Sequence, residues 1–153
     1  VHNAMAKGKL TQQQLNRILR GSHGHVWWNG RELATVQKIE NKMTGDFEDI
    51  NVCGDPATYA VYNGWSGEGT LEQLKVDSEI AHEIVQAMLS GDFPECEIIA
   101  LLENPSTGKR ERCRVGLVTF TEASIATFEK KSIITESIPY KFSDFEFLET
   151  ISA

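Results

Sequence analysis

The sequence lacks the features that mark several large classes of protein. Its longest apolar stretch, Ile98 to Leu102, falls far short of the roughly 18 residues that a membrane helix needs. Its three cysteines form no CxxC pair, so we expect the reduced, buried thiols of a cytosolic protein rather than a disulfide framework. Basic residues are in the minority, with 15 Lys and Arg against 22 Asp and Glu. Sequence-specific nucleic-acid binding is therefore not expected, because it needs a concentrated basic surface.

Complete catalytic and metal-binding motifs are also missing. His82-Glu83 resembles the start of the zinc motif HExxH, but residue 86 is Gln, so the second histidine ligand is absent. Gly67-Glu68-Gly69 resembles the start of the dinucleotide motif GxGxxG, but Glu72 replaces the third glycine and would repel a pyrophosphate. The nucleophile-elbow pattern GxSxG does not occur. The sequence therefore predicts no enzyme activity, no metal site and no cofactor.

A short arm is predicted to precede one β-rich domain. With 153 residues, 41% hydrophobic and 24% charged, the chain has room for a single domain of ordinary soluble composition. Thr11 and Gln14 form a capping box, which predicts a short helix from Gln12 to Arg20. We therefore expect an arm over residues 1–25 and a β-sandwich domain over residues 26–153. The arm has few apolar side chains to dock it and is expected to need a partner surface; they are Leu15, Ile18 and Leu19.

The first half of the domain has the alternating pattern of β-strands. Asn29-Gly30 lies between apolar runs and predicts a hairpin. The stretch from Gly54 to Gly69 combines turn-forming residues with aromatic ones and predicts a long loop, a kind of segment that commonly binds something. Strands whose two faces are not purely apolar are expected at Leu33 to Lys42, Glu48 to Cys53 and Thr70 to Val76.

One amphipathic helix and a meander follow. Apolar residues at helical spacing, from Ile80 to Leu89, predict a helix that begins at Asp77 or Ser78 and ends at Gly91. Apolar residues then alternate along the chain, and this apolar phase slips by one residue beside Gly116, which predicts a bulge. It slips again between Phe142 and Phe145. The expected fold is mainly β (α+β), an antiparallel β-sandwich or partial barrel with one flanking α-helix. The expected meander strands are Glu97 to Glu103, Arg110 to Thr121, Ile125 to Glu129 and Ile133 to Phe147.

These patterns leave two functions open. Strands with mixed faces, an arm and an aromatic loop favour self-assembly, because exposed strand edges must be blocked or paired. The alternative is a monomeric small β-barrel that binds a ligand, with Trp and Tyr side chains at its mouth.

Several segments, taken in order, resemble the tail tube proteins of contractile phage tails and phage-tail-like bacteriocins, in particular the PBSX-like prophage group. The resemblance extends from about Val26 to Glu149. It rests on the order and spacing of Asn29-Gly30, Ile50-Asn51-Val52-Cys53-Gly54, Gly67-Glu68-Gly69-Thr70, Leu74-Lys75-Val76-Asp77-Ser78 and Ile138-Pro139-Tyr140-Lys141-Phe142-Ser143-Asp144-Phe145.

The resemblance implies a structural subunit whose hexameric rings stack into a hollow tube, for passage of DNA or for membrane puncture. It implies a place in a virion tail or tail-like particle that is assembled in the host bacterial cytoplasm. Expected partners are other copies of the chain and the sheath, tape-measure, baseplate and tail-terminator proteins. We expect an acidic lumen that lets its cargo slide. Residues expected to face it are Gln37, Glu40, Lys42, Glu68, Glu72 and Lys75; residues expected to contact neighbouring subunits are Phe47, Tyr59, Tyr62 and Trp65.

Overall fold

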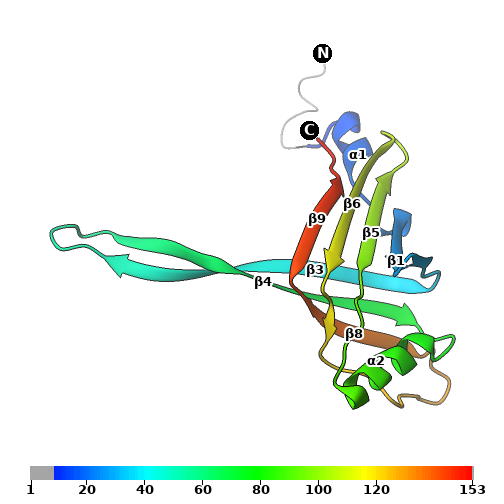
Figure 1. Ribbon diagram of the computed structural model, residues 1–153. Helices are drawn as coiled ribbons and strands as arrows, with labels where there is room; N and C mark the ends of the chain where they lie inside the picture. The colour runs from blue at the N-terminus through cyan, green and yellow to red at the C-terminus, as the bar shows by residue number, and fades with distance from the viewer. Residues whose placement is uncertain (1–8, 153) are drawn as a thin grey trace.

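Two antiparallel sheets pack against each other to form the body of the protein, in a computed structural model that describes residues 9–152. Their strands cross at a steep angle, and a helix lies at one end of the body (Figure 1). The predicted sandwich is confirmed, but the sheets do not close into a barrel. The five-stranded sheet has the order β2-β1-β5-β6-β9 and consists of β1 (Gly24–Trp28), β2 (Arg31–Glu32), β5 (Ile98–Asn104), β6 (Lys109–Gly116) and β9 (Asp144–Glu149). The four-stranded sheet has the order β3-β4-β8-β7 and consists of β3 (Val36–Asn51), β4 (Thr58–Leu74), β7 (Thr119–Phe120) and β8 (Thr135–Phe142).

The hairpin predicted at Asn29-Gly30 is confirmed. Trp28 pairs with Arg31, and both turn residues have positive φ, 49° at Asn29 and 84° at Gly30. These values are those of a type I′ turn, which suits the twist of a two-residue hairpin. The returning strand is only two residues long, because the chain then leaves for the other sheet, where β3 begins at Val36 rather than at Leu33.

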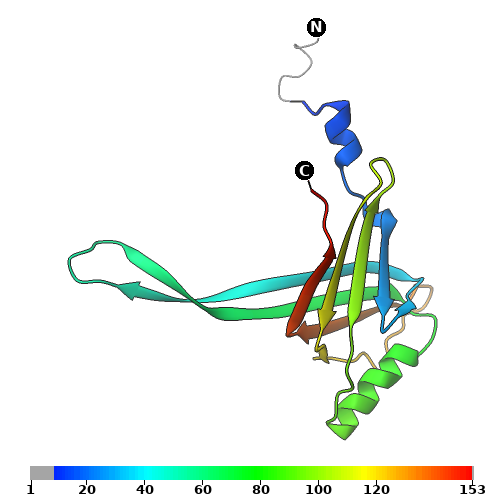
Figure 2. The same ribbon diagram turned by 45° about the horizontal axis from the view of Figure 1, so that its top comes forward.

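The predicted aromatic loop is wrong, because most of that stretch is strand. β3 continues through the segment expected as a separate strand, turns at residues 52–57, and returns as β4 in an antiparallel pair that runs from Asn51 opposite Thr58 to Val36 opposite Gln73. A register shift between Asp46 and Phe47 leaves Asn63 without a residue opposite it, while Gly64 pairs with Asp46. The result is a long hairpin that extends well beyond the body (Figures 1 and 2).

The two slips of apolar phase mark places where the chain changes sheets. After Gly116 the chain passes from β6 to β7, with Leu117 at a positive φ of 50°, and at Ser143 it passes from β8 to β9. The two crossings are adjacent, since the Ser143 N–H donates to the Gly116 carbonyl at 3.4 Å. The predicted bulge at Gly116 is therefore wrong. The strand expected at Ile125 to Glu129 is also wrong, because residues 121–134 form an irregular connection.

The predicted helix is confirmed as α2 (Glu79–Ser90), and Gly91 ends it with a left-handed φ of 73°. Its buried side chains pack on a core that both sheets share, in which Trp28 of β1 stacks on Phe120 of β7 at a centroid distance of 5.1 Å. Trp28 Nε1 also donates to Glu83 Oε2 at 3.3 Å, which joins the helix to the five-stranded sheet. The buried face is narrower than the apolar spacing suggested and consists of Ile80, Ile84 and Ala87.

The arm contains the predicted capping box at the start of α1 (Gln12–Arg17). Thr11 Oγ1 accepts from the Gln14 N–H at 3.2 Å, and Gln14 Oε1 accepts from the Thr11 N–H at 2.9 Å. The helix ends at Arg17 rather than Arg20, because Ile18 is extended. A 3₁₀ turn, η2 (Gly21–His23), then leads into β1.

The three thiols lie in different surroundings. Cys96 is buried and Cys113 half-buried, whereas Cys53 is exposed, so the expectation of buried cysteines is wrong for Cys53. Among the helices of residues 9–152, none is long and apolar enough to cross a membrane.

Candidate assembly site

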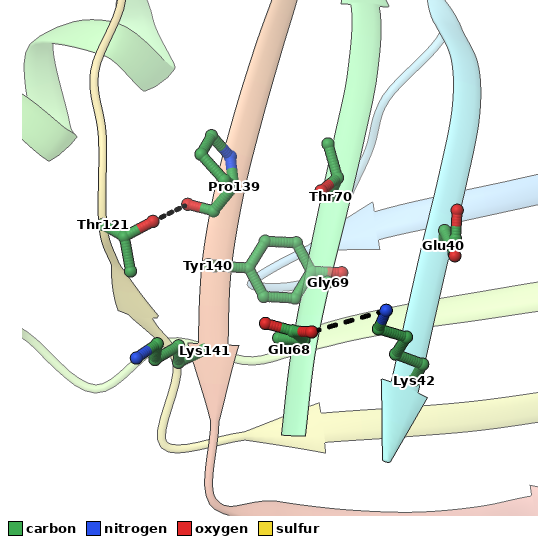
Figure 3. Close-up of a pocket in the computed structure, with 9 residues that line it drawn as sticks. All are labelled: Glu40, Lys42, Glu68, Gly69, Thr70, Thr121, Pro139, Tyr140 and Lys141. Carbon is green, nitrogen blue, oxygen red and sulfur yellow. Dashed lines mark hydrogen bonds and ion pairs between the residues drawn. The ribbon is translucent and has the colours of Figure 1, made fainter. Parts of the chain in front are cut away.

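The outward face of the four-stranded sheet is polar, and its residues align in three rows across the strands. Lys38, Glu72 and Ser137 form one row; Glu40, Thr70 and Pro139 form the next. The third row contains Lys42, Glu68 and Lys141. Figure 3 shows the last two rows from the open side of the sheet. We call this surface the polar face; its polar members are Lys38, Glu40, Lys42, Glu68, Thr70, Glu72, Ser137 and Lys141.

Charges on the polar face balance one another. Lys42 Nζ lies 3.5 Å from Glu68 Oε1, and Lys38 Nζ lies 3.8 Å from Glu40 Oε2. All four side chains are more than half exposed, so each ion pair contributes little to stability, about 0–1 kcal/mol. The face has three basic and three acidic side chains. The Lys and Glu side chains of this face therefore cancel in charge, and most acidic residues of the chain lie elsewhere.

Aromatic side chains beneath the polar face explain the alternation Gly67-Glu68-Gly69. Glycine is required on the inward side, because a Cβ at Gly69 would lie 2.7 Å from the Tyr140 ring, and one at Gly67 would overlap the Phe142 ring. Glu68, between them, points outward. The Tyr140 ring crosses over Gly69, and its hydroxyl donates to Asn41 Oδ1, so one inward row is tied together across three strands. Burial raises the pKa of Tyr140 well above its usual value.

The structure brings four of the six predicted lumen residues onto one face: Glu40, Lys42, Glu68 and Glu72. Gln37 lies at a register shift of β3 beside Val36 and lines a hollow at the edge of the sandwich instead. Lys75 follows the end of β4, where its N–H donates to the Ile134 carbonyl at 2.9 Å. Sequence reasoning missed Ser137 and Lys141, although the alternation of Ile138, Tyr140 and Phe142 already placed them on the opposite face.

The hairpin extension, residues 44–66, carries the four predicted contact residues. β8 pairs with β4 only from Gly67 to Leu74, so beyond Gly67 the two strands of the hairpin have only each other as partners. Large apolar side chains there are 38–57% exposed, among them Phe47, Tyr59, Tyr62 and Trp65. Exposed apolar clusters of this kind mark interaction surfaces.

The aromatic side chains of the extension are arranged by contacts within it and with β8. Phe47 and Tyr62 are cross-strand neighbours with ring centroids 5.4 Å apart, and Trp65 lies 6.2 Å from Phe142. Tyr59 is opposite Ile50 on the other side of the strand pair, and its hydroxyl donates to Asp55. That hydrogen bond lowers the pKa of Asp55 and raises the pKa of Tyr59. The extension therefore presents apolar surface on both sides.

Two edges of the four-stranded sheet are open. Within residues 9–152, β3 pairs with β4 on one side only, and the outer edge of β8 is covered only at Pro139, Tyr140 and Lys141, by Thr121 and β7. Unpaired backbone groups along a strand edge favour pairing with another chain. The edges, the polar face and the extension belong to the same sheet, so this sheet is the candidate assembly site.

Two carboxylates of β9 are held in ion pairs, and the buried thiol of Cys96 is unreactive. Asp144 accepts from Arg114 Nη1 at 3.0 Å, and Glu149 accepts from Arg110 Nη2 at 2.9 Å, so these carboxylates are held in ion pairs. Burial raises the pKa of the Cys96 thiol to about 11, which keeps it protonated and unreactive at neutral pH. Within residues 9–152, no group of three or more potential metal ligands comes together.

Comparison with known proteins agrees with this architecture. The chain is 27% identical to the phage-like element PBSX protein XkdM of Bacillus subtilis strain 168, over 88% of this chain and 92% of that protein. Its fold is similar to a chain of the sheath-tube complex of the PVC extracellular contractile injection system in the extended state (TM-score 0.71, 11% identity, 93% and 100% of the two chains covered). It is also similar to a chain of the tube-terminating cap of the anti-feeding prophage (TM-score 0.72, 12% identity, 96% and 99% covered). The model of one protein family, described as phage tail tube protein, matches residues 11–149. Since that match extends over most of its length, the chain belongs to the phage tail tube protein family.

Proposed function

We propose that this chain is the repeating subunit of the inner tube of a contractile tail or tail-like particle, in which hexameric rings stack into a hollow tube. Family membership supports the tube subunit. The observation that carries the mode of assembly is the open edge of β3, a strand of 16 residues. A similar fold occurs in a baseplate chain of the anti-feeding prophage whose structure is described as 6-fold symmetrised (TM-score 0.59).

Ring closure follows from the two open edges of the four-stranded sheet. If β3 of one copy lies beside β8 of the next, the sheet continues from copy to copy until it closes. Closure of a sheet into a barrel removes the free edges that a single copy exposes. The contact joins different surfaces of the two copies, and a heterologous contact that repeats through a closing rotation gives a ring.

The polar face would then line the bore of the tube. The opposite side of this sheet packs in the core through Leu71, Ile138 and Tyr140, so only the polar side can face a water-filled bore. Balanced charges on this face would neither bind nor strongly repel a passing chain. DNA and a tape-measure protein are both compatible with such a bore, and membrane puncture needs only the hollow cylinder.

The hairpin extension would contact the adjacent subunit or the adjacent ring, which would cover its exposed aromatic side chains. The outer partners would be the sheath, the baseplate and the tail-terminator proteins. This proposal rests on similar folds in chains from a sheath-tube complex, a sheath/tube terminator and a baseplate. The particle would be assembled in the host bacterial cytoplasm. The sheets do not close within one copy, so the structure gives no support to the monomeric ligand-binding barrel.

Replacement of Tyr59, Tyr62 and Trp65 with Ser tests the role of the extension. We expect the triple variant to keep the fold of the body, because all three side chains lie outside the core, but to form no tubes under the electron microscope. The control variant has Phe at the same three positions, which retains most of the apolar surface and should retain the tubes. Normal tubes from the Ser variant would refute this role of the extension.

A further inference from the structure

The N-terminal arm and helix α2 lie at opposite ends of the body. Figure 1 shows α1 beside the turn between β5 and β6, whereas α2 lies at the far end of the same strands, and Figure 2 shows the same separation. Both ends expose apolar side chains that no other described part of the same copy covers. Each end is therefore available to another molecule.

The arm combines exposed apolar side chains with positive charge. Leu10 is 60% exposed and Ile18 is 53% exposed, and α1 has no buried residue. One side-chain hydrogen bond positions the helix, from Asn104 Nδ2 to the Asn16 carbonyl at 3.0 Å. Residues 1–30 contain four Lys or Arg and no Asp or Glu, in a chain with a net charge of −7. The arm is thus a basic, apolar segment with little attachment to its own body.

The C-terminal end of α2 has the complementary character. Leu89 lies opposite the buried face of the helix and is 77% exposed, and Met88 and Phe93 beside it are each more than one-third exposed. The last turn of the helix has no basic residue, so the negative end of its dipole is not neutralised. Residues 76–108 contain seven Asp or Glu and no Lys or Arg. Asp92 and Glu95 are in no ion pair within the described residues, whereas Glu79 and Glu97 pair with arginines.

We propose that the arm of one copy, residues 9–20, docks on the α2 end of a second copy. The α2 end consists of Met88, Leu89, Asp92, Phe93 and Glu95. Apolar side chains of the arm would cover those of the helix, while Arg17 and Arg20 would lie near the acidic side chains and the negative helix terminus. This contact deepens the proposed tube function, because it joins opposite ends of two copies and so links copies head to tail along a stack.

Charge reversal in a mixture of two variants tests the contact. One variant carries R17E and R20E, and the other carries D92K and E95K. Each variant alone places like charges opposite each other at the contact. We therefore expect roughly a tenfold or greater rise in the protein concentration needed for assembly, measured by light scattering. An equimolar mixture should assemble at close to the wild-type concentration, because each arm then meets a surface of opposite charge.

The outcomes separate the possible partners of the arm. Recovery in the mixture supports a contact between copies and also excludes misfolding of either variant. Recovery only in a chain that carries all four substitutions would place the contact within one copy and overturn the proposal. No effect of either reversal on assembly would also overturn it, and would leave the α2 end to a different protein.

Crosslinking tests the same contact without relying on tubes. In a C53S background, I18C copies are mixed with L89C copies and oxidised. The matched control replaces L89C with V52C, which is 53% exposed in the turn between β3 and β4, away from the α2 end. A disulfide-linked dimer with L89C but not V52C supports the docking, and equal yields or no dimer overturn it. If the wild-type protein forms no rings, the proposed function fails, while this crosslink still decides the arm contact.

Discussion

Substitution of Gly67 by Ala tests the packing that holds the polar face in place. The added Cβ would overlap the ring of Phe142, which is 3% exposed and packed in the core. Overpacking of this kind costs about 1–3 kcal/mol. For a protein of this size, each kcal/mol lowers the melting temperature by about 2–4 °C, so we expect a fall of roughly 2–12 °C.

The assay is thermal unfolding followed by circular dichroism, at a concentration low enough to keep the protein unassembled. Gly21→Ala is the matched control, because a Cβ there meets nothing within 4 Å and the backbone is not left-handed. The double variant with Gly67→Ala and Phe142→Leu should lose less stability than the sum of the single variants, since the smaller side chain relieves the overlap. An unchanged melting temperature for Gly67→Ala would refute the packing argument.

Two further predictions concern buried groups. Tyr140→Phe removes the hydroxyl that donates to Asn41, and should lower the free energy of unfolding by about 0.5–1.5 kcal/mol in urea titrations; no change would mean that water satisfies Asn41 equally well. Burial raises the pKa of Cys96 from 9.0 to about 11, so the preference of the folded state for the neutral thiol stabilises the protein below pH 9 and is lost as the pH rises to 11. Stability measured between pH 9 and 11 should therefore fall less steeply in Cys96→Ala than in the wild type, and parallel curves would contradict this assignment.

Local chemical signals were sufficient to predict several elements of the fold. Asn29-Gly30 specifies its own turn, the capping box fixes the start of α1, and Gly91 ends α2, because each signal acts within a few residues. The end of α1 was placed too late, since no residue of this helix is buried by the rest of residues 9–152 and Ile18 is extended.

The long hairpin could not be predicted from local patterns, because the structural role of its glycines and Asn63 depends on the strands that lie beside them. Gly67 and Gly69 resemble loop residues in the sequence, yet each makes room for an aromatic ring of β8 that lies far along the chain. The slips of apolar phase were real, but the sequence alone does not distinguish a bulge from a change of sheet. The distinction becomes clear only when the pairing of the strands in both sheets is known.

The candidate site was predicted in part. Strand alternation placed Glu40, Lys42, Glu68 and Glu72 on one face, whereas Gln37 fell at a register shift that depends on the partner strand. The charge of that face could not be predicted, because the net charge of a chain says nothing about where its acids lie. They are concentrated around α2 instead.

Cryo-electron microscopy of the purified, concentrated chain tests the central claim most directly. We predict hollow tubes in which β3 of each copy lies beside β8 of the next and the side chains of Glu68 and Glu72 face the bore. A population that remains at the 17.1 kDa of a single chain, or tubes whose bore is lined by the five-stranded sheet, would contradict the account.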